Sequence, residues 1–315
     1  MKIFWQDTVI AIVLLFFISL PIWGGNQIYS NVLNGNHSFA EDIKDKRLFY
    51  PMLGDKDIPL NIEADAYFSV LIDPDQKDSN KTLLKKNDDS ALPMASITKL
   101  MTAVVAIDNY KLDDEILIDE SDLRVDGNMA SLKPGQVFKV KDLLYFMLID
   151  SNNGAAEAFA RKMGRDSFVK KMNQKAAFLK MNKTSYLNPS GLDIDGVERT
   201  NMTSSEDLTR LVIEIMNRYP LIGEMLGNPE YTIYDKGGSS HQLTNTNLML
   251  SDDDNILWGK TGFTLKAKGC LVLVSKPRNF SFSQKRYIII TVLGAEDRFE
   301  TMRRIRSWQD NQFIW

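Results

Sequence analysis

The chain has 315 residues, of which 44% are hydrophobic and 25% are charged, an ordinary composition for a globular protein with one large domain or two smaller ones. Its formal net charge is -3, which makes a broad nucleic-acid-binding surface unlikely. With one cysteine and two histidines, the chain cannot form an internal disulfide and has too few ligands for a Cys/His metal site.

An apolar run near the N-terminus follows a single basic residue. Lys2 precedes the run 9–23, whose fifteen residues reach about 22 Å as a helix, less than a bilayer core of about 30 Å. Counted from Ile3, the reach is about 31 Å. We therefore expect residues 1–24 to be a signal anchor or a signal peptide, with the N-terminus inside and the body exported. No small-x-small cleavage site lies at the expected place, which favours an uncleaved membrane anchor.

Residues 25–60 are polar, and we interpret them as a spacer before a catalytic domain at 61–315. Within that domain, strands are predicted at 64–73, 82–86, 115–118, 271–275 and 286–293, and helices at 96–107, 140–147, 155–163, 208–217 and 297–308. This order indicates an α+β domain, in which helices flank an antiparallel sheet and a mainly helical subdomain is inserted at about 110–240. The acidic triplet 252–254 and the arginines at 303, 304 and 306 are interpreted as solvated.

The first pair of residues with catalytic potential is Ser96 and Lys99. They lie three residues apart at the start of an apolar run, so a helix would bring the lysine amine to the serine hydroxyl. The pattern alone is weak, because about one such match is expected by chance in a chain of this length. A second match begins at Ser167 and is interpreted as a solvated helix face. Taken alone, Ser96 is most simply a helix-capping residue.

Two further motifs follow along the chain. Ser151-Asn152-Asn153 is the only Ser-x-Asn sequence, and it lies between two predicted helices, where a hydroxyl and an amide can face a cleft. A helix cap followed by a turn is the alternative interpretation. Lys-Thr-Gly occurs once, at 260–262, after a short apolar stretch.

These residue types support nucleophilic catalysis without histidine. A serine hydroxyl needs a nearby base, and Lys99 is the available candidate. A free lysine, with a pKa of about 10.4, is protonated at neutral pH, but burial and a second cation such as Lys260 both lower that pKa. Ser151 can then relay a proton to the leaving amine, and Asn153 can hold the substrate amide or orient Lys99. Lys260 and Thr261 can bind a substrate carboxylate.

The order Ser-x-x-Lys, Ser-x-Asn, Lys-Thr-Gly is the signature of penicillin-binding proteins and class A β-lactamases. The segments PMASITKLMTAVVA, DSNNGAAEAFA, YLNPSGL and GKTGFT resemble the D-alanyl-D-alanine carboxypeptidases, which are low-molecular-mass penicillin-binding proteins of serine peptidase family S11. The resemblance runs from about Ala64 to the C-terminus. It implies a penicillin-binding-protein/β-lactamase-like fold and hydrolysis of the D-Ala-D-Ala end of peptidoglycan stem peptides through an acyl-enzyme on Ser96. It implies β-lactams as covalent inhibitors and no metal or organic cofactor.

The resemblance also implies an oxyanion hole made by the backbone N–H groups of Ser96 and Phe263. Gly262 lets the strand backbone approach the ligand closely. The expected catalytic residues are Ser96, Lys99 and Ser151, and the expected substrate-binding residues are Asn153, Lys260, Thr261, Gly262, Phe263 and Thr264. Many relatives carry Ala-Gly after the last of these, where this chain has Leu265 to Gly269, so its substrate preference can differ.

Three alternatives stay open. The enzyme can be a D,D-endopeptidase that cuts peptide cross-links, because that reaction breaks the same kind of bond; the shorter relatives, which lack a second β-rich domain and a C-terminal anchor as this chain does, include endopeptidases. It can be a serine β-lactamase, although no Glu-x-x-Leu-Asn sequence lies between Ser151 and Lys260. It can also be a non-catalytic β-lactam-binding scaffold of the envelope. In each case we expect an exported body, anchored to the bacterial membrane by residues 1–24 or else secreted or periplasmic.

Overall fold

The computed structural model describes residues 52–53, 60–74, 80–125, 132–193, 199–278 and 285–314. The predicted anchor at 1–24 and nearly all of the predicted spacer at 25–60 lie outside the described residues. Within the described ranges, no helix combines the length and the apolar character needed to cross a membrane. All described elements belong to one unit, Pro51–Trp315.

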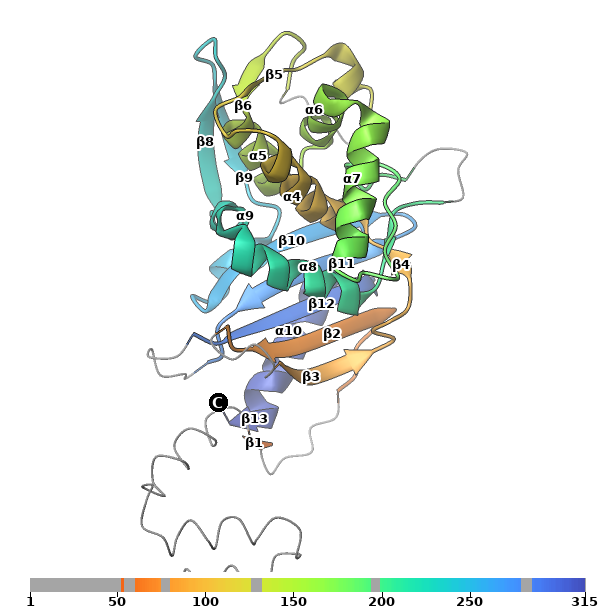
Figure 1. Ribbon diagram of the computed structural model, residues 1–315. Helices are drawn as coiled ribbons and strands as arrows, with labels where there is room; N and C mark the ends of the chain where they lie inside the picture. The colour runs from red at the N-terminus through yellow and green to blue at the C-terminus, as the bar shows by residue number, and fades with distance from the viewer. Residues whose placement is uncertain are drawn as a thin grey trace, which may run out of the picture. The chain divides into compact units, whose positions relative to one another are not determined.

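A five-stranded antiparallel sheet is the centre of the fold (Figure 1). Its strands are β2 (Ala66–Ile72), β3 (Lys81–Lys86), β10 (Ile256–Thr264), β11 (Lys268–Ser275) and β12 (Tyr287–Ala295). Their order is β10-β11-β12-β2-β3, so early and late parts of the chain meet where β12 pairs with β2. The strands predicted at 64–73, 82–86, 271–275 and 286–293 all lie in this sheet.

A hydrophobic core covers each face of the sheet, and the side chains of β12 alternate between the two cores. Ile289 and Leu293 belong to the hydrophobic core on one face, and Ile288 and Ile290 belong to the core on the other. Helix α8 (Ser205–Arg218) contacts the first face, and α10 (Arg298–Gln312) contacts the second. Thr291 faces α8 and donates a hydrogen bond to the backbone oxygen of Ser205 at 3.0 Å. The expected α+β architecture, with helices flanking an antiparallel sheet, is confirmed.

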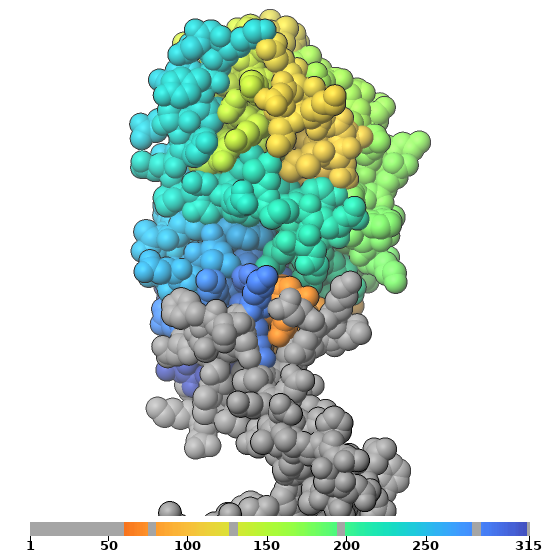
Figure 2. All heavy atoms as spheres, turned by 60° about the vertical axis from the view of Figure 1, so that its left-hand side comes forward, coloured from red at the N-terminus to blue at the C-terminus, as the bar shows by residue number. Residues whose placement is uncertain are grey.

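The remaining helices stand above α8 (Figure 1). They are α4 (Lys99–Asn109), α5 (Val140–Ile149), α6 (Asn153–Met163), α7 (Arg165–Phe178) and α9 (Pro220–Leu226). Three short 3-10 helices lie elsewhere along the chain: η1 (Ala95–Thr98) before α4, η2 (Glu120–Leu123) between α4 and α5, and η3 (Leu248–Ser251) before β10. Four two-stranded pairs complete the fold: β1 (Met52–Leu53) with β13 (Phe313–Ile314), β4 (Leu92–Pro93) with β7 (Met202–Thr203), β5 (Glu115–Leu117) with β6 (Val137–Lys139), and β8 (Glu230–Tyr234) with β9 (Ser240–Thr244). Figure 2 shows α8 and α9, in teal, as a band between this helical half and the sheet strands.

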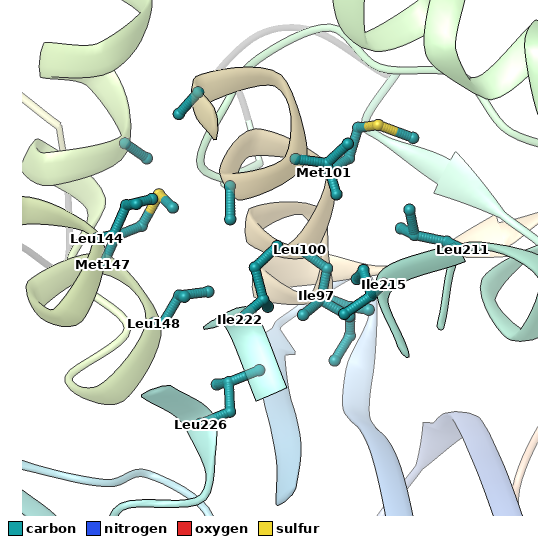
Figure 3. Close-up of a cluster of buried hydrophobic side chains, with 14 of the residues drawn as sticks. Ile97, Leu100, Met101, Leu144, Met147, Leu148, Leu211, Ile215, Ile222 and Leu226 are labelled. Carbon is teal, nitrogen blue, oxygen red and sulfur yellow. The ribbon is translucent and has the colours of Figure 1, made fainter. Parts of the chain in front are cut away.

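Helix α4 is the central helix of this half and contacts α5, α6, α7 and α8. One cluster of buried apolar side chains around its N-terminal end is drawn in Figure 3; it includes Ile97, Leu100 and Met101 of η1 and α4, Leu144, Met147 and Leu148 of α5, Leu211 and Ile215 of α8, and Ile222 and Leu226 of α9. All are fully buried, and burial of each such side chain contributes about 1.5–3 kcal/mol to folding. This packing fixes the N-terminal end of α4 above the sheet.

Candidate active site

Ser96 lies in η1, the single 3-10 turn that leads into α4. We predicted an α-helix from Ser96, but the α-helix begins only at Lys99. The tighter turn suits the pair, because residues i and i+3 of a 3-10 helix are eclipsed. Lys99 Nζ therefore lies 2.7 Å from Ser96 Oγ. Ala95, just before the serine, has a φ of 48°, a conformation that non-glycine residues rarely adopt.

The amine of Lys99 is fully buried and has three oxygen neighbours. Besides Ser96 Oγ, it contacts Asn153 Oδ1 at 2.7 Å and the backbone oxygen of Ser190 at 2.8 Å. The last two atoms are carbonyl oxygens and can only accept hydrogen bonds. A neutral amine has two N–H donors and one lone pair. With both donors used on Asn153 and Ser190, the lone pair is directed at the Ser96 hydroxyl.

The surroundings of Lys99 favour this neutral form. Burial lowers the pKa of Lys99 well below its ordinary value, and the nearby positive charge of Lys260 lowers it further. The carboxylate of Glu157 acts in the opposite direction and raises the pKa of Lys99. The net effect is a pKa well below the ordinary value of a lysine, which makes Lys99 a better base than an exposed lysine.

The Ser151–Asn153 motif joins α5 to α6 and divides its polar groups between two tasks. Asn152 is the N-cap of α6 and accepts a hydrogen bond from the backbone N–H of Ala155 at 2.9 Å. Ser151 has a φ of 57°, and its Oγ accepts a hydrogen bond from Lys260 Nζ at 2.7 Å. The helix-cap interpretation is therefore confirmed for Asn152, and the cleft interpretation of Ser151 and Asn153 stays a prediction.

Lys260 projects from edge strand β10 toward the same space. Successive side chains of a strand point to opposite faces of the sheet, so residues 258, 260 and 262 lie on the same face. η1 and α9 pack on that face. Lys260 is 1% exposed. Burial and the cation of Arg298 lower its pKa to about 7, against the opposing effect of Asp150. Lys260 thus changes its protonation state near neutral pH, and an anion that enters the site favours its protonated form.

The other residues expected on β10 have different surroundings. A Cβ on Gly262 would lie 2.9 Å from Met94 O and 3.1 Å from Ser96 N, so the glycine allows η1 to lie directly against the strand. Thr261 shares a hydrogen bond of 2.7 Å with the hydroxyl of Thr246. The side chain of Phe263 is 58% exposed at the rim.

Thr264 lies at the end of β10, where its hydroxyl accepts a hydrogen bond from the backbone N–H of Ala267 at 3.1 Å. That hydrogen bond belongs to the turn between β10 and β11. The structure therefore places the polar groups of the three motifs in two hydrogen-bonded sets, one of Ser96, Lys99 and Asn153 and the other of Ser151 and Lys260.

The loop at 188–192 supplies groups that sequence reasoning did not single out. Asn188 accepts a hydrogen bond from the N–H of Gly191 at 2.6 Å and donates one to the oxygen of Leu192 at 2.9 Å, which holds the loop in a tight turn. The turn presents the oxygen of Ser190 to Lys99. The turn-forming residues Asn, Pro, Ser and Gly were visible in the sequence, but their contact with a residue about ninety positions earlier was not.

A hollow of about 1000 Å³ lies elsewhere, between β6 and the β8–β9 hairpin. Its walls include Gln136, Asp235 and His241, and none of the residues of the three motifs. Asp235 accepts hydrogen bonds from Gln136 at 2.8 Å and from the N–H of Ser239 at 2.9 Å, so its carboxylate has structural partners. The candidate site is therefore defined by the chemistry of its side chains and not by the size of a cavity.

Known proteins are similar to this chain in sequence. A family model of D-alanyl-D-alanine carboxypeptidase (Peptidase S11) matches residues 55–296. The chain is 32% identical over 259 residues to the D-alanyl-D-alanine endopeptidase of Pseudomonas aeruginosa, and the aligned segment covers 80% of this chain and 79% of that protein. It is 30% identical over 245 residues to the D-alanyl-D-alanine carboxypeptidase DacF of Bacillus subtilis, covering 76% and 60% of the two chains.

Solved structures agree with the family match. Penicillin-binding protein D2 of Listeria monocytogenes, in its cefotaxime-bound form, is similar with a TM-score of 0.66 and 27% identity, covering 81% of this chain and 99% of that chain. The Streptomyces K15 DD-transpeptidase has a TM-score of 0.69 and 25% identity, covering 80% and 98%. These similarities confirm the predicted penicillin-binding-protein-like fold. Since the matched segment contains all three motifs, the chain belongs to the D-alanyl-D-alanine carboxypeptidase family, serine peptidase family S11.

Proposed function

We propose that this chain is a serine D,D-carboxypeptidase that removes the terminal D-Ala of peptidoglycan stem peptides, with Ser96 as nucleophile and Lys99 as its base. Family membership supplies the reaction class. The observation that carries the residue roles is the set of three contacts made by the Lys99 amine, two to carbonyl oxygens and one to the Ser96 hydroxyl.

In the first step, Ser96 Oγ attacks the carbonyl carbon of the penultimate D-Ala, and its proton moves to Lys99 Nζ. A C–O bond forms, and negative charge develops on the former carbonyl oxygen. The backbone N–H groups of Ser96 and Phe263 are suited to stabilise that oxyanion. The close approach of Gly262 to Ser96 N brings those two backbone segments together.

In the second step, the C–N bond breaks and the leaving amine takes up a proton. Ser151 is suited to relay that proton, because its hydroxyl contacts Lys260 and it belongs to the same loop as Asn153, the partner of Lys99. The terminal D-Ala departs, and an ester on Ser96 remains. Water then attacks the ester carbonyl and gives a proton to Lys99. The bond between the carbonyl carbon and Ser96 Oγ breaks, Lys99 returns the proton to Ser96 Oγ, and the shortened peptide leaves with a new carboxylate.

Lys260 and Thr261 are suited to bind the carboxylate at the end of the substrate. The pKa of Lys260 is about 7 in the free enzyme, so a bound carboxylate favours its protonated form. Binding of a stem peptide is therefore expected to take up a proton near neutral pH. Isothermal titration calorimetry in buffers with different ionisation enthalpies measures that uptake.

A D,D-endopeptidase activity is the second candidate function. It is favoured by the 32% identity to the endopeptidase of Pseudomonas aeruginosa. Both reactions use the same nucleophile and base, and they differ in whether the departing amine belongs to a free D-Ala or to a cross-linked peptide. Release of D-Ala from a synthetic pentapeptide, compared with release of monomers from cross-linked muropeptide dimers, separates the two.

We propose that the enzyme acts outside the cytoplasm, because peptidoglycan is assembled there, and that residues 1–24 anchor it to the bacterial membrane. The anchor proposal rests on the sequence alone, from the basic residue Lys2 and the apolar run 9–23. A reporter enzyme fused after residue 60 should be active only when it is exported. Recovery of the reporter in the cytoplasm contradicts the proposal.

Intact-protein mass spectrometry with benzylpenicillin tests the proposed nucleophile. The wild-type full-length chain should gain one adduct that lasts for minutes or longer, and Ser96→Ala should gain none. Ser167→Ala, in the other Ser-x-x-Lys sequence, is the matched control and should acylate like the wild type. Rapid loss of the adduct with release of hydrolysed drug would indicate a β-lactamase. No adduct on folded wild-type protein would favour the non-catalytic scaffold.

A further inference from the structure

A buried carboxylate lies behind the amine of Lys99. Glu157 projects from α6 and is 7% exposed. Ser190 connects the two residues: its backbone oxygen accepts from Lys99 at 2.8 Å, and its hydroxyl lies 3.3 Å from Glu157 Oε1. The hydroxyl is equally close to Asn188 Oδ1, so the two acceptors share its proton. Only one residue thus separates the carboxylate from the proposed base.

The second oxygen of this carboxylate has a partner toward the surface. Arg165, the first residue of α7, donates from Nε to Glu157 Oε2 at 3.0 Å. The Arg165 side chain is 49% exposed, so water screens its charge, whereas Glu157 is screened little. The negative charge of Glu157 therefore acts toward the interior, where it opposes the effects of burial and of Lys260 on Lys99.

Two charged groups act on Lys99 from the elements packed around it. Lys260, from β10, disfavours the ammonium form, and Glu157, from α6, favours it. Transfer of the Ser96 proton creates an ammonium inside the protein, and an unpaired buried charge is costly. The carboxylate lowers that cost as the charge appears. The aspartate of a Ser-His-Asp triad does the same for its imidazolium.

We propose that Glu157 is a positioning residue for Lys99, stabilising the ammonium that forms when Ser96 gives up its proton, and that Arg165 moderates this effect from the surface. No proton passes to Glu157: the proton moves from Ser96 Oγ to Lys99 Nζ and stays there until the leaving amine takes it. The inference rests on the proposed role of Lys99 as the base.

The test is the rate of acylation by benzylpenicillin from pH 5 to 10, measured on the full-length chain. Glu157→Gln removes the charge, so the acidic limb of the profile should move to lower pH by about one unit, a tenfold rate change at a fixed pH on that limb. The rate at high pH should fall about threefold or more, because Lys99 becomes a weaker base. Arg165→Gln should move the limb in the opposite direction, to higher pH.

Two further variants separate a charge effect from loss of structure. Arg165→Lys keeps the charge and should restore most of the wild-type limb position. Arg210→Gln removes an arginine of similar exposure, which pairs with Glu206 and Asp207 of α8, and should leave the profile unchanged. A purely structural role would lower the rates of Glu157→Gln and Arg165→Gln without opposite displacements.

The inference is overturned if the limb of Glu157→Gln coincides with that of the wild type, or if both charge-removing variants move it in the same direction. The arginine is half exposed, so its variants test the sign even where Glu157→Gln does not fold. Failure of the proposed function gives a different result: wild-type protein without an adduct, or Ser96→Ala with one.

Discussion

Gly191 allows a direct test of the packing around Ser96, the proposed nucleophile. Its φ is 84°, and an added Cβ would lie 2.5 Å from the carbonyl carbon of Ala95 and 2.7 Å from Thr98 Oγ1. The first atom is backbone and belongs to the residue before Ser96, so it cannot move aside without moving Ser96. Gly191→Ala therefore combines an unfavourable φ with a steric overlap.

The size of the effect follows from these two contributions. A left-handed conformation costs a non-glycine residue about 1–2 kcal/mol, and overpacking adds about 1–3 kcal/mol. We expect Gly191→Ala to lower the free energy of unfolding by about 3 kcal/mol or more. A displacement of Ser96 of about 1 Å should slow penicillin acylation about a hundredfold in the molecules that stay folded.

Gly238 supplies the matched control. Its φ is 86°, and a Cβ there would have no neighbour within 4 Å. Gly238→Ala should lower the free energy of unfolding by only about 1 kcal/mol and leave acylation unchanged. Urea unfolding and acylation kinetics of the two variants, side by side, isolate the overlap. Equal stabilities and equal acylation rates would refute the argument from packing.

Three further predictions concern titration and burial. The pKa of Lys260 falls from 10.5 to about 7 on folding, so between these pH values the unfolded chain binds more protons than the folded chain. The free energy of unfolding therefore rises with pH over this range. Urea titrations at pH 7 and pH 10 should show that Lys260→Met reduces this rise by about 3 kcal/mol. Burial raises the pKa of Cys270 to about 12, so iodoacetamide should label it, by mass, only in denaturant, and labelling of the folded protein would contradict this. Burial acts to raise the pKa of Asp253, but the N–H of Asn255 and the cation of Arg306 outweigh burial and hold that pKa at about 2. Asp253→Asn should therefore lower the free energy of unfolding by about 1–2 kcal/mol at pH 7. The difference in stability between this variant and the wild type should vanish as the pH falls through 2.

The chemistry of the site was readable from the sequence because each motif is local. Ser96 and Lys99 are three residues apart, so any helical turn places them together, and the structure brings their polar atoms to 2.7 Å. The convergence of three motifs from distant parts of the chain was inferred from their order and from a family resemblance. Residue spacing alone contains no information on that convergence. The oxygen of Ser190 and the carboxylate of Glu157 escaped notice for that reason.

The surface predictions failed where a long-range ion pair intervenes. We expected Arg306 to be solvated with its neighbours on α10 and the acidic triplet to be a solvated turn. Arg306 is instead 8% exposed and donates to Asp253 at 2.7 Å, joining α10 to the loop before β10. Arg303 contacts Asp252 at 2.8 Å and stays exposed, as expected. A helical pattern identifies a polar face, but it does not show which element packs against that face.

The pairing of β2 with β12 determines when the enzyme first becomes competent. These two strands lie more than two hundred residues apart, and the strand that carries Lys260 joins the sheet only through β11 and β12. Contacts across such a separation are slow to form and require nearly the whole chain. A chain emerging from synthesis or export therefore has Ser96 and Lys99 long before it has the strand that carries Lys260. We expect that penicillin does not acylate the nascent protein until β10, β11 and β12 have joined the sheet.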